Sequence, residues 1–144
     1  MLVKLITFSL FWVLLAFSIS ADTFEVKMLN KGESGSMIFE PAFVFAKIGD
    51  TVTFVPTDKG HNVESIKGML PDGVKRFKSK LNKEFTISLE QEGLYGVKCT
   101  PHYAMGMIAL IQVGNATNLD KVLALKQRGK AKKRFPLLFA QIQN

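Results

Sequence analysis

The chain of 144 residues contains one cysteine, Cys99, and only two histidines, His61 and His102. A single cysteine cannot pair within its own chain, so intramolecular disulfides are excluded and a hydrophobic core must hold the fold together. Internal repeats and low-complexity segments are also missing. The length suits one ordinary domain rather than two. A lone cysteine in such a chain is a buried thiol, a pairing partner, a nucleophile or a metal ligand.

The main body of the chain lacks net charge, because residues 22–119 hold 11 basic and 11 acidic residues. The positive excess comes from residues 120–144, where seven basic residues accompany only Asp120. Basic blocks are typical of chains that bind nucleic acid or anionic lipid. Here no stacking aromatics or recognition-helix pattern accompanies them, so no nucleic-acid partner is expected.

The N-terminus has the pattern of a secretory signal peptide over residues 1–21. Lys4 precedes an apolar run that ends at Phe17, and small residues lead to Ala21. This run is shorter than the ~20 residues of a membrane-spanning helix. We therefore expect export to the periplasm, cleavage near Ala21 and no membrane association of the mature chain. An uncleaved membrane anchor is the alternative.

The mature chain has the short alternating segments of an all-β protein. Phe24, Val26 and Met28 alternate with polar residues, and residues 51–55 are rich in β-branched side chains after a Gly-Asp turn. Further strands are expected at 85–89, 95–99 and 107–113. Several short strands separated by turn signals favour a β-sandwich.

The pattern changes to a helical period in residues 115–144. Asn118 is placed to cap a helix that starts at Leu119 and stops near Gly129. A second helical segment follows, but Pro136 lies inside it, which predicts a break or a new helix start there. We expect one folded domain over 22–114 and a helical extension over 115–144 that packs on it.

The most informative segment is Cys99-Thr-Pro-His-Tyr-Ala-Met-Gly-Met107, which joins two predicted strands. It places a thiolate, an imidazole and a thioether within one tight loop, at Cys99, His102 and Met107. His61 is the only other histidine and follows a predicted strand. Two histidines, one cysteine and a weak methionine form the ligand set of a blue-copper electron-transfer site, which leaves no open position for catalysis at the metal.

With this loop and His61, the sequence resembles the pseudoazurins, periplasmic blue-copper proteins with the cupredoxin fold. The resemblance covers about residues 23–125. It rests on segments of specific sequence: Met28-Leu-Asn-Lys-Gly32, Phe39-Glu-Pro41, Gly49-Asp-Thr-Val-Thr-Phe54, Asp58-Lys-Gly-His-Asn-Val-Glu-Ser-Ile-Lys67, Phe77-Lys-Ser-Lys80 and Val97-Lys-Cys-Thr-Pro-His-Tyr-Ala-Met-Gly-Met-Ile-Ala-Leu-Ile111.

The resemblance implies a Greek-key β-sandwich of about eight strands with two C-terminal helices. It also implies one Cu(I)/Cu(II) ion of type 1, with Met107 rather than Met105 as the axial ligand. Asn62 is expected to brace the ligand loops, Pro101 to border the exposed edge of His102, and Met37 to lie near the His102 ring. The implied copper ligands are His61, Cys99, His102 and Met107.

The resemblance further implies a non-enzymatic electron carrier that is a monomer. Its expected partners are redox proteins that dock weakly at the His102 face, with a copper nitrite reductase as acceptor and a c-type cytochrome as donor. A ring of lysines around that face would steer acidic partners. These partner-docking residues are Lys31, Lys59, Lys78 and Lys98.

The same residues allow three other interpretations. Zinc binds cysteine and histidine well, but a methionine gives no reason to prefer it. A Cys–His nucleophile pair would need an orienting group and an oxyanion hole, of which the sequence gives no sign. A copper chaperone without a transfer role is the third, and such a protein needs a labile, accessible site.

Overall fold

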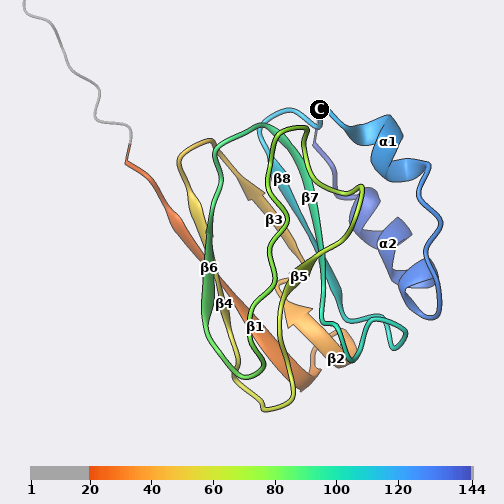
Figure 1. Cartoon of the computed structure of the whole chain (residues 1–144). Helices are drawn as coiled ribbons and strands as arrows, with labels where there is room; N and C mark the ends of the chain where they lie inside the picture. Colours follow the sequence, from red (N-terminus) through yellow and green to blue (C-terminus); the bar gives the residue numbers. More distant parts are fainter. Residues whose placement is uncertain (1–19, 144) are drawn as a thin grey trace, which may run out of the picture.

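The computed structural model describes residues 20–143, which form two four-stranded sheets packed face to face with two short helices on one side (Figure 1). The predicted all-β cupredoxin-like sandwich is confirmed. The first sheet contains, in spatial order, β2 (Gly35–Glu40), β1 (Thr23–Gly32), β4 (Thr51–Val55) and β6 (Phe85–Ser88). The second contains β3 (Phe43–Ala46), β8 (Ile108–Val113), β7 (Gly93–Lys98) and β5 (Glu64–Ser65).

Strand pairing brings the ends of several strands to one end of the sandwich. β1 pairs with β4 in parallel, so that the segments after both strands leave the sheet on the same side. β7 and β8 form an antiparallel pair with Lys98 opposite Ile108, and the loop between them closes that same end. These connections carry every residue of the predicted copper site.

β8 is buried on both faces, which explains its run of six buried residues. Ala109, Ile111 and Val113 face the core between the sheets, as the predicted alternation requires. Ile108 and Leu110 face the opposite way and pack against the helices in a second apolar cluster. The loop between β7 and β8, residues 99–107, carries three of the predicted ligands and is called the metal loop below. It leads into a strand that is packed between two layers.

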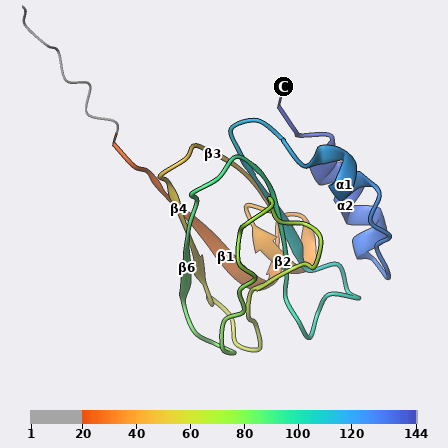
Figure 2. The same ribbon diagram turned by 45° about the horizontal axis from the view of Figure 1, so that its top comes forward.

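The C-terminal helices α1 (Leu119–Leu123) and α2 (Ala131–Phe139) provide the outer layer of that second cluster. Figures 1 and 2 show both helices beside β7 and β8, away from β4 and β6. In the described part of the chain, no helix is both long and apolar enough to cross a membrane.

Two expectations for the tail were wrong. Asn118 precedes α1, but its side chain makes no capping hydrogen bond and instead bonds the backbone of Leu94 in β7, accepting from N–H (2.7 Å) and donating to C=O (3.0 Å). The helix also ends at Leu123 rather than near Gly129. The Asn118 side chain therefore links the tail to the sandwich. It satisfies the N–H and C=O groups of Leu94, which point away from the neighbouring strand β8.

Pro136 does not break the second helix, contrary to the sequence-based expectation, because α2 continues through it to Phe139. Pro136 is exposed. Because proline has no N–H, the carbonyl of Lys132, four residues earlier, lacks its usual helical hydrogen bond, and Lys132 is also exposed. Water can hydrate that carbonyl at an exposed position. Ala131, Phe135 and Leu138 bury the other face of the helix and hold it on the sandwich.

The predicted signal peptide and the alternative anchor fall outside the described residues, apart from positions 20 and 21, and they stay predictions. The same holds for the domain boundaries that depend on the cleavage point.

Burial of α2 leads to a stability prediction. Phe135→Ala removes a fully buried ring and should lower the free energy of unfolding by about 3–5 kcal/mol. Leu137→Ala, at a side chain that is 67% exposed on the same helix, should change it by less than about 0.5 kcal/mol. Urea unfolding of the copper-free protein measures both. Equal effects would show that α2 is not packed as described.

Candidate metal centre

Two loops at one end of the sandwich bring three donor side chains together. His61 lies in the connection between β4 and β5, and Cys99 and His102 lie in the β7–β8 loop. Their candidate ligand atoms all lie within 4.8 Å of one another. Cys99 Sγ is 3.7 Å from His61 Nδ1 and 3.5 Å from His102 Nδ1. Both imidazoles thus present Nδ1 to the sulfur.

These separations fit one metal ion in the middle. First-row metals bond imidazole at about 2.0 Å and thiolate at about 2.3 Å, and angles of about 110–120° then place the two donors about 3.5–3.7 Å apart. The rings of His61 and His102 are 5.0 Å apart between centroids, at 64° to each other. Shared coordination of one ion is consistent with that arrangement.

The orientation of His61 is fixed by a residue that sequence analysis did not single out. Asn30, in β1, has its Oδ1 2.8 Å from His61 Nε2. Because an amide oxygen only accepts, Nε2 carries the proton and Nδ1 keeps its lone pair for a metal. The Asn30 N–H in turn donates to the Asp58 carboxylate at 2.7 Å, which ties β1 to the His61 loop.

Met107 lies directly before β8, fully buried, in the same apolar cluster as Cys99. Its N–H donates to His102 C=O (3.1 Å), and its own C=O accepts from Cys99 N–H (3.0 Å). The backbone therefore joins the three loop ligands in a compact turn. Met105 points outward, with 42% of its surface exposed. This contrast agrees with the axial role that the family pattern gives to Met107.

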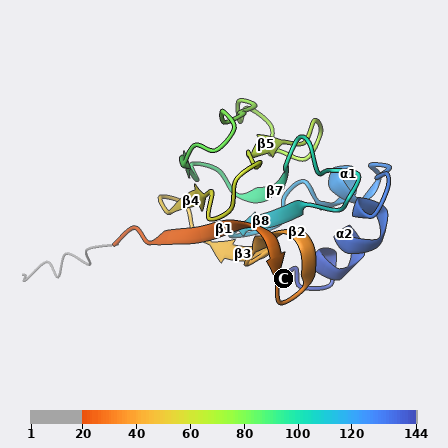
Figure 3. The ribbon, with the colours of Figure 1, turned by 90° about the horizontal axis from the view of Figure 1, so that it is seen from below.

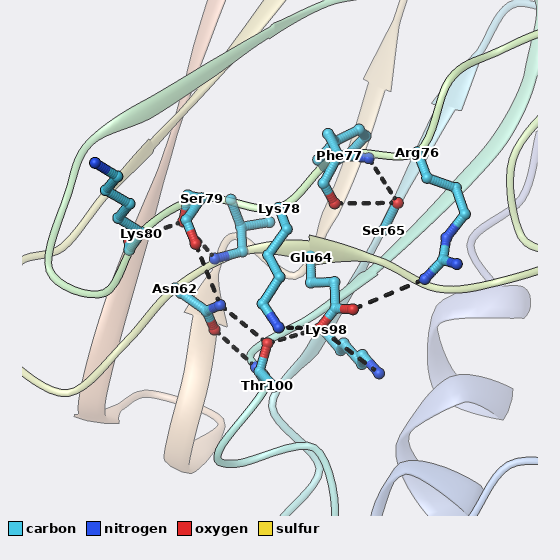
Figure 4. Close-up of polar contacts among 11 residues, drawn as sticks. Asn62, Glu64, Ser65, Arg76, Phe77, Lys78, Ser79, Lys80, Lys98 and Thr100 are labelled. Carbon is cyan, nitrogen blue, oxygen red and sulfur yellow. Dashed lines mark hydrogen bonds and ion pairs between the residues drawn. The ribbon is translucent and has the colours of Figure 1, made fainter.

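Asn62, next to His61, connects the two ligand loops (Figure 4). Its Oδ1 accepts from Thr100 N–H at 2.8 Å, and its Nδ2 donates to Thr100 Oγ1 at 2.9 Å. The side chain is 4% exposed, so water competes little for these bonds. The two ligand-bearing segments are thereby held in one register.

The network continues to Glu64, whose carboxylate accepts from the Thr100 hydroxyl at 2.7 Å. Figure 4 shows the Glu64 side chain beside three cations. Burial raises the pKa of Glu64, but the Thr100 hydrogen bond and the charges of Lys98 and Lys78 outweigh it, and the pKa lies below its usual value. The three ion pairs join Glu64 to Arg76 (3.8 Å), Lys78 (3.5 Å) and Lys98 (3.8 Å).

Burial also controls the protons at the donor atoms. It raises the pKa of the Cys99 thiol, which the backbone N–H groups of Asn62 and His102 lower only in part. It lowers the pKa of His61, and the neighbouring His102 lowers it further, against the opposite effect of Asp58. A metal must therefore displace a proton from Cys99 but finds His61 neutral.

The remaining predicted residues lie around this centre. Pro101 is exposed beside His102, and Met37 is half-buried against the cluster that contains Cys99. Lys31 and Lys59 are exposed near the ends of β1 and β4, while Lys78 and Lys98 pair with Glu64. Sequence reasoning did not assign roles to Asn30, Glu64, Thr100 or Arg134, because each acts through contacts between distant segments.

Comparisons with known proteins match this geometry. Residues 26–114 match the family model of copper-binding proteins of the plastocyanin/azurin family. Pseudoazurin from Paracoccus pantotrophus is 58% identical over 123 residues, which cover 85% of each protein. The chain also resembles the crystal structures of two pseudoazurins, each with a TM-score of 0.82. That from Methylobacterium extorquens AM1 is 49% identical, over 85% of this chain and all of the other. That from Hyphomicrobium denitrificans is 46% identical, over 85% and 99%.

The family match identifies copper as the metal for which these donors are arranged. His61, Cys99, His102 and Met107 form a type 1 copper site, with nitrogen and thiolate donors in the buried pocket and a thioether beside them. The identity extends over nearly the whole described structure and not only the metal loop. The chain therefore belongs to the plastocyanin/azurin family of copper-binding proteins, and within it to the pseudoazurins.

Proposed function

We propose that this protein carries single electrons between larger redox proteins in the periplasm. The observation that supports this most directly is the unequal exposure of the four ligands. His61, Cys99 and Met107 are fully buried, whereas His102 is half-buried and reaches the surface. The site thus leaves little access for a substrate, but one ligand ring offers a short path for an electron.

Bound copper supplies the Cu(I)/Cu(II) couple, and the chain's own residues keep the donors in place through both states. Asn30 holds the His61 ring, and Asn62 holds the two loops together. Donors that do not move require little rearrangement when an electron arrives, which favours fast transfer. The buried, four-ligand pocket is a poor design for a chaperone, which must release its metal.

The surface around His102 suits a weak redox encounter. Pro101, Ala104 and Met105 from the same loop are exposed and apolar, so a partner can approach closely and exclude water. Lys31 and Lys59 are exposed nearby, and in the described structure neither makes an ion pair. Such a surface fits a small interface with an acidic partner. The family resemblance supports a copper nitrite reductase as acceptor and a c-type cytochrome as donor.

The first prediction from this proposed function concerns colour. The Cu(II)-loaded protein should be intensely blue and should bleach reversibly on addition of one electron. Cys99→Ser should lose the blue thiolate-to-copper band but keep the β-rich circular dichroism spectrum, because serine is nearly the size of cysteine and fills the same buried position. Met105→Leu, at an exposed methionine of the same loop, is the matched control and should stay blue. A colourless wild-type protein or a blue Cys99→Ser would refute the metal assignment.

The second prediction concerns steering. Lys59→Glu should slow oxidation of the reduced protein by the anion hexacyanoferrate(III) several-fold at about 10 mM salt, where charges act over about 30 Å, and hardly at about 1 M. Lys47→Glu is the matched control, because Lys47 precedes β4 and Lys59 follows it, at the opposite end of the strand. Stopped-flow absorbance gives the rates. If the two variants behave alike at low salt, local steering is wrong.

The third prediction concerns export. Expression of the full chain in a bacterium should place the protein in the periplasmic fraction, and its N-terminal sequence should begin at or within two residues of Asp22. Retention of Met1 in a membrane fraction would instead support an uncleaved anchor.

A further inference from the structure

The start of α2 and the turn before it lie against the outer side of the metal loop. Lys130 N–H donates to the Ala104 carbonyl at 2.9 Å, and Gly129 packs closely on the same residue. Arg128 lies 5.5 Å from the centroid of the Tyr103 ring. The tail therefore covers the part of the loop between His102 and Met107, and Figure 3 shows α2 beside the strands on that side.

Arg134, one turn further along α2, reaches back to two segments of the sandwich about 28 and 97 residues away in sequence. Its Nη1 donates to the carbonyls of Gly106 (2.8 Å) and Met37 (2.9 Å), and its Nη2 donates to that of Ser36 (3.0 Å). In the described structure no carboxylate lies within 4.0 Å of this guanidinium. Its hydrogen bonds are made to backbone alone.

Two of the three bonded carbonyls, those of Gly106 and Met37, belong to residues with positive φ. Gly106 directly precedes the axial ligand Met107 and has φ +86°. A Cβ there would lie 2.9 Å from Arg134 Cδ and 3.0 Å from Lys130 Cβ, so glycine is required for the tail to approach this closely. Met37, with φ +52°, adopts a conformation that costs a non-glycine residue energy and must be held in place.

We propose that Arg134 is a positioning residue for the copper site: its guanidinium fixes the Gly106–Met107 peptide against β2, and so sets the axial position of Met107. The helical tail then belongs to the machinery of the metal site rather than only to the fold. This inference rests on copper binding by Met107, not on which partner receives the electron.

Arginine suits this role better than lysine. Its planar fork carries five donors in fixed directions, so one side chain can join carbonyls from two segments at once. An ammonium group places its donors on a flexible stem and cannot reproduce that geometry. Arg134→Lys therefore keeps the charge but removes the clamp.

The test separates positioning from charge by the sign of the change in reduction potential. Loss of a positive charge near copper favours Cu(II) and lowers the potential, whereas a loosened axial donor favours Cu(I) and raises it. We expect Arg134→Lys to shift the potential upward, in the direction of Met107→Leu, and to change the ratio of the visible absorption bands. Lys133→Met, which removes an exposed charge from the neighbouring position, should leave the bands unchanged.

A second measurement needs no copper. Gly106 N–H donates to Tyr103 C=O (2.9 Å) and Met107 N–H to His102 C=O (3.1 Å), and amide exchange can follow both groups in protein prepared without copper. Both amides should exchange with deuterium several-fold faster in Arg134→Lys than in wild type, and at the wild-type rate in Lys133→Met. If Arg134→Lys folds poorly, Arg134→Met compared with Lys133→Met serves instead, since each removes one charge.

The proposal is overturned if Arg134→Lys lowers the unfolding midpoint but keeps the wild-type potential, band ratio and amide exchange, because Arg134 would then be structural only. A wild-type protein that takes up no copper would refute the function proposed above. The apo exchange experiment would still decide whether the clamp exists.

Discussion

The pair of hydrogen bonds between Asn62 and Thr100 is the constraint on which the metal centre depends. His61 and Cys99 are separated by 38 residues, and each lies in a loop that strand pairing alone places only approximately. Asn62 and Thr100 follow these two ligands directly, so a two-point bond between them fixes the spacing of the imidazole and the thiol. A site with no open position tolerates little error in that spacing, because its donors must suit both oxidation states of copper.

A second constraint comes from the other side of the loop, through the way β8 uses its two faces. Ala109 and Ile111 pack between the sheets, while Ile108 and Leu110 pack under the helices. Met107 therefore leads into a strand that cannot shift without disturbing two cores. The same arrangement buries one face of α2 against β8. It thereby brings α2 within reach of the metal loop.

How much the sequence predicts depends on how local each feature is. The Cys-x2-His-x4-Met spacing lies within one loop, so Cys99, His102 and Met107 are found from the sequence alone. The strands with clear alternation are predicted well, and β4 matches residue for residue. β2 and β3 have no comparable pattern, and only the family resemblance implies them. The contacts of Asn30 and Arg134 need the assembled fold, and neither residue type signals its role in isolation. Pro136 shows the reverse case, in which packing of α2 outweighs a strong local preference.

The charges near the centre serve the ligand loop as well as the surface, because one carboxylate lies among three cations. Lys78 and Lys98 both lie beside Glu64, a carboxylate that is 14% exposed and accepts from the Thr100 hydroxyl. One carboxylate cancels only one of the three charges of Arg76, Lys78 and Lys98, so the group keeps a net positive charge while Glu64 orients Thr100, the residue after Cys99. In the proposed encounter, this group would attract an acidic partner together with Lys31 and Lys59, which make no ion pair in the described structure. The positive charges that hold the ligand loop would thus also contribute to the proposed docking.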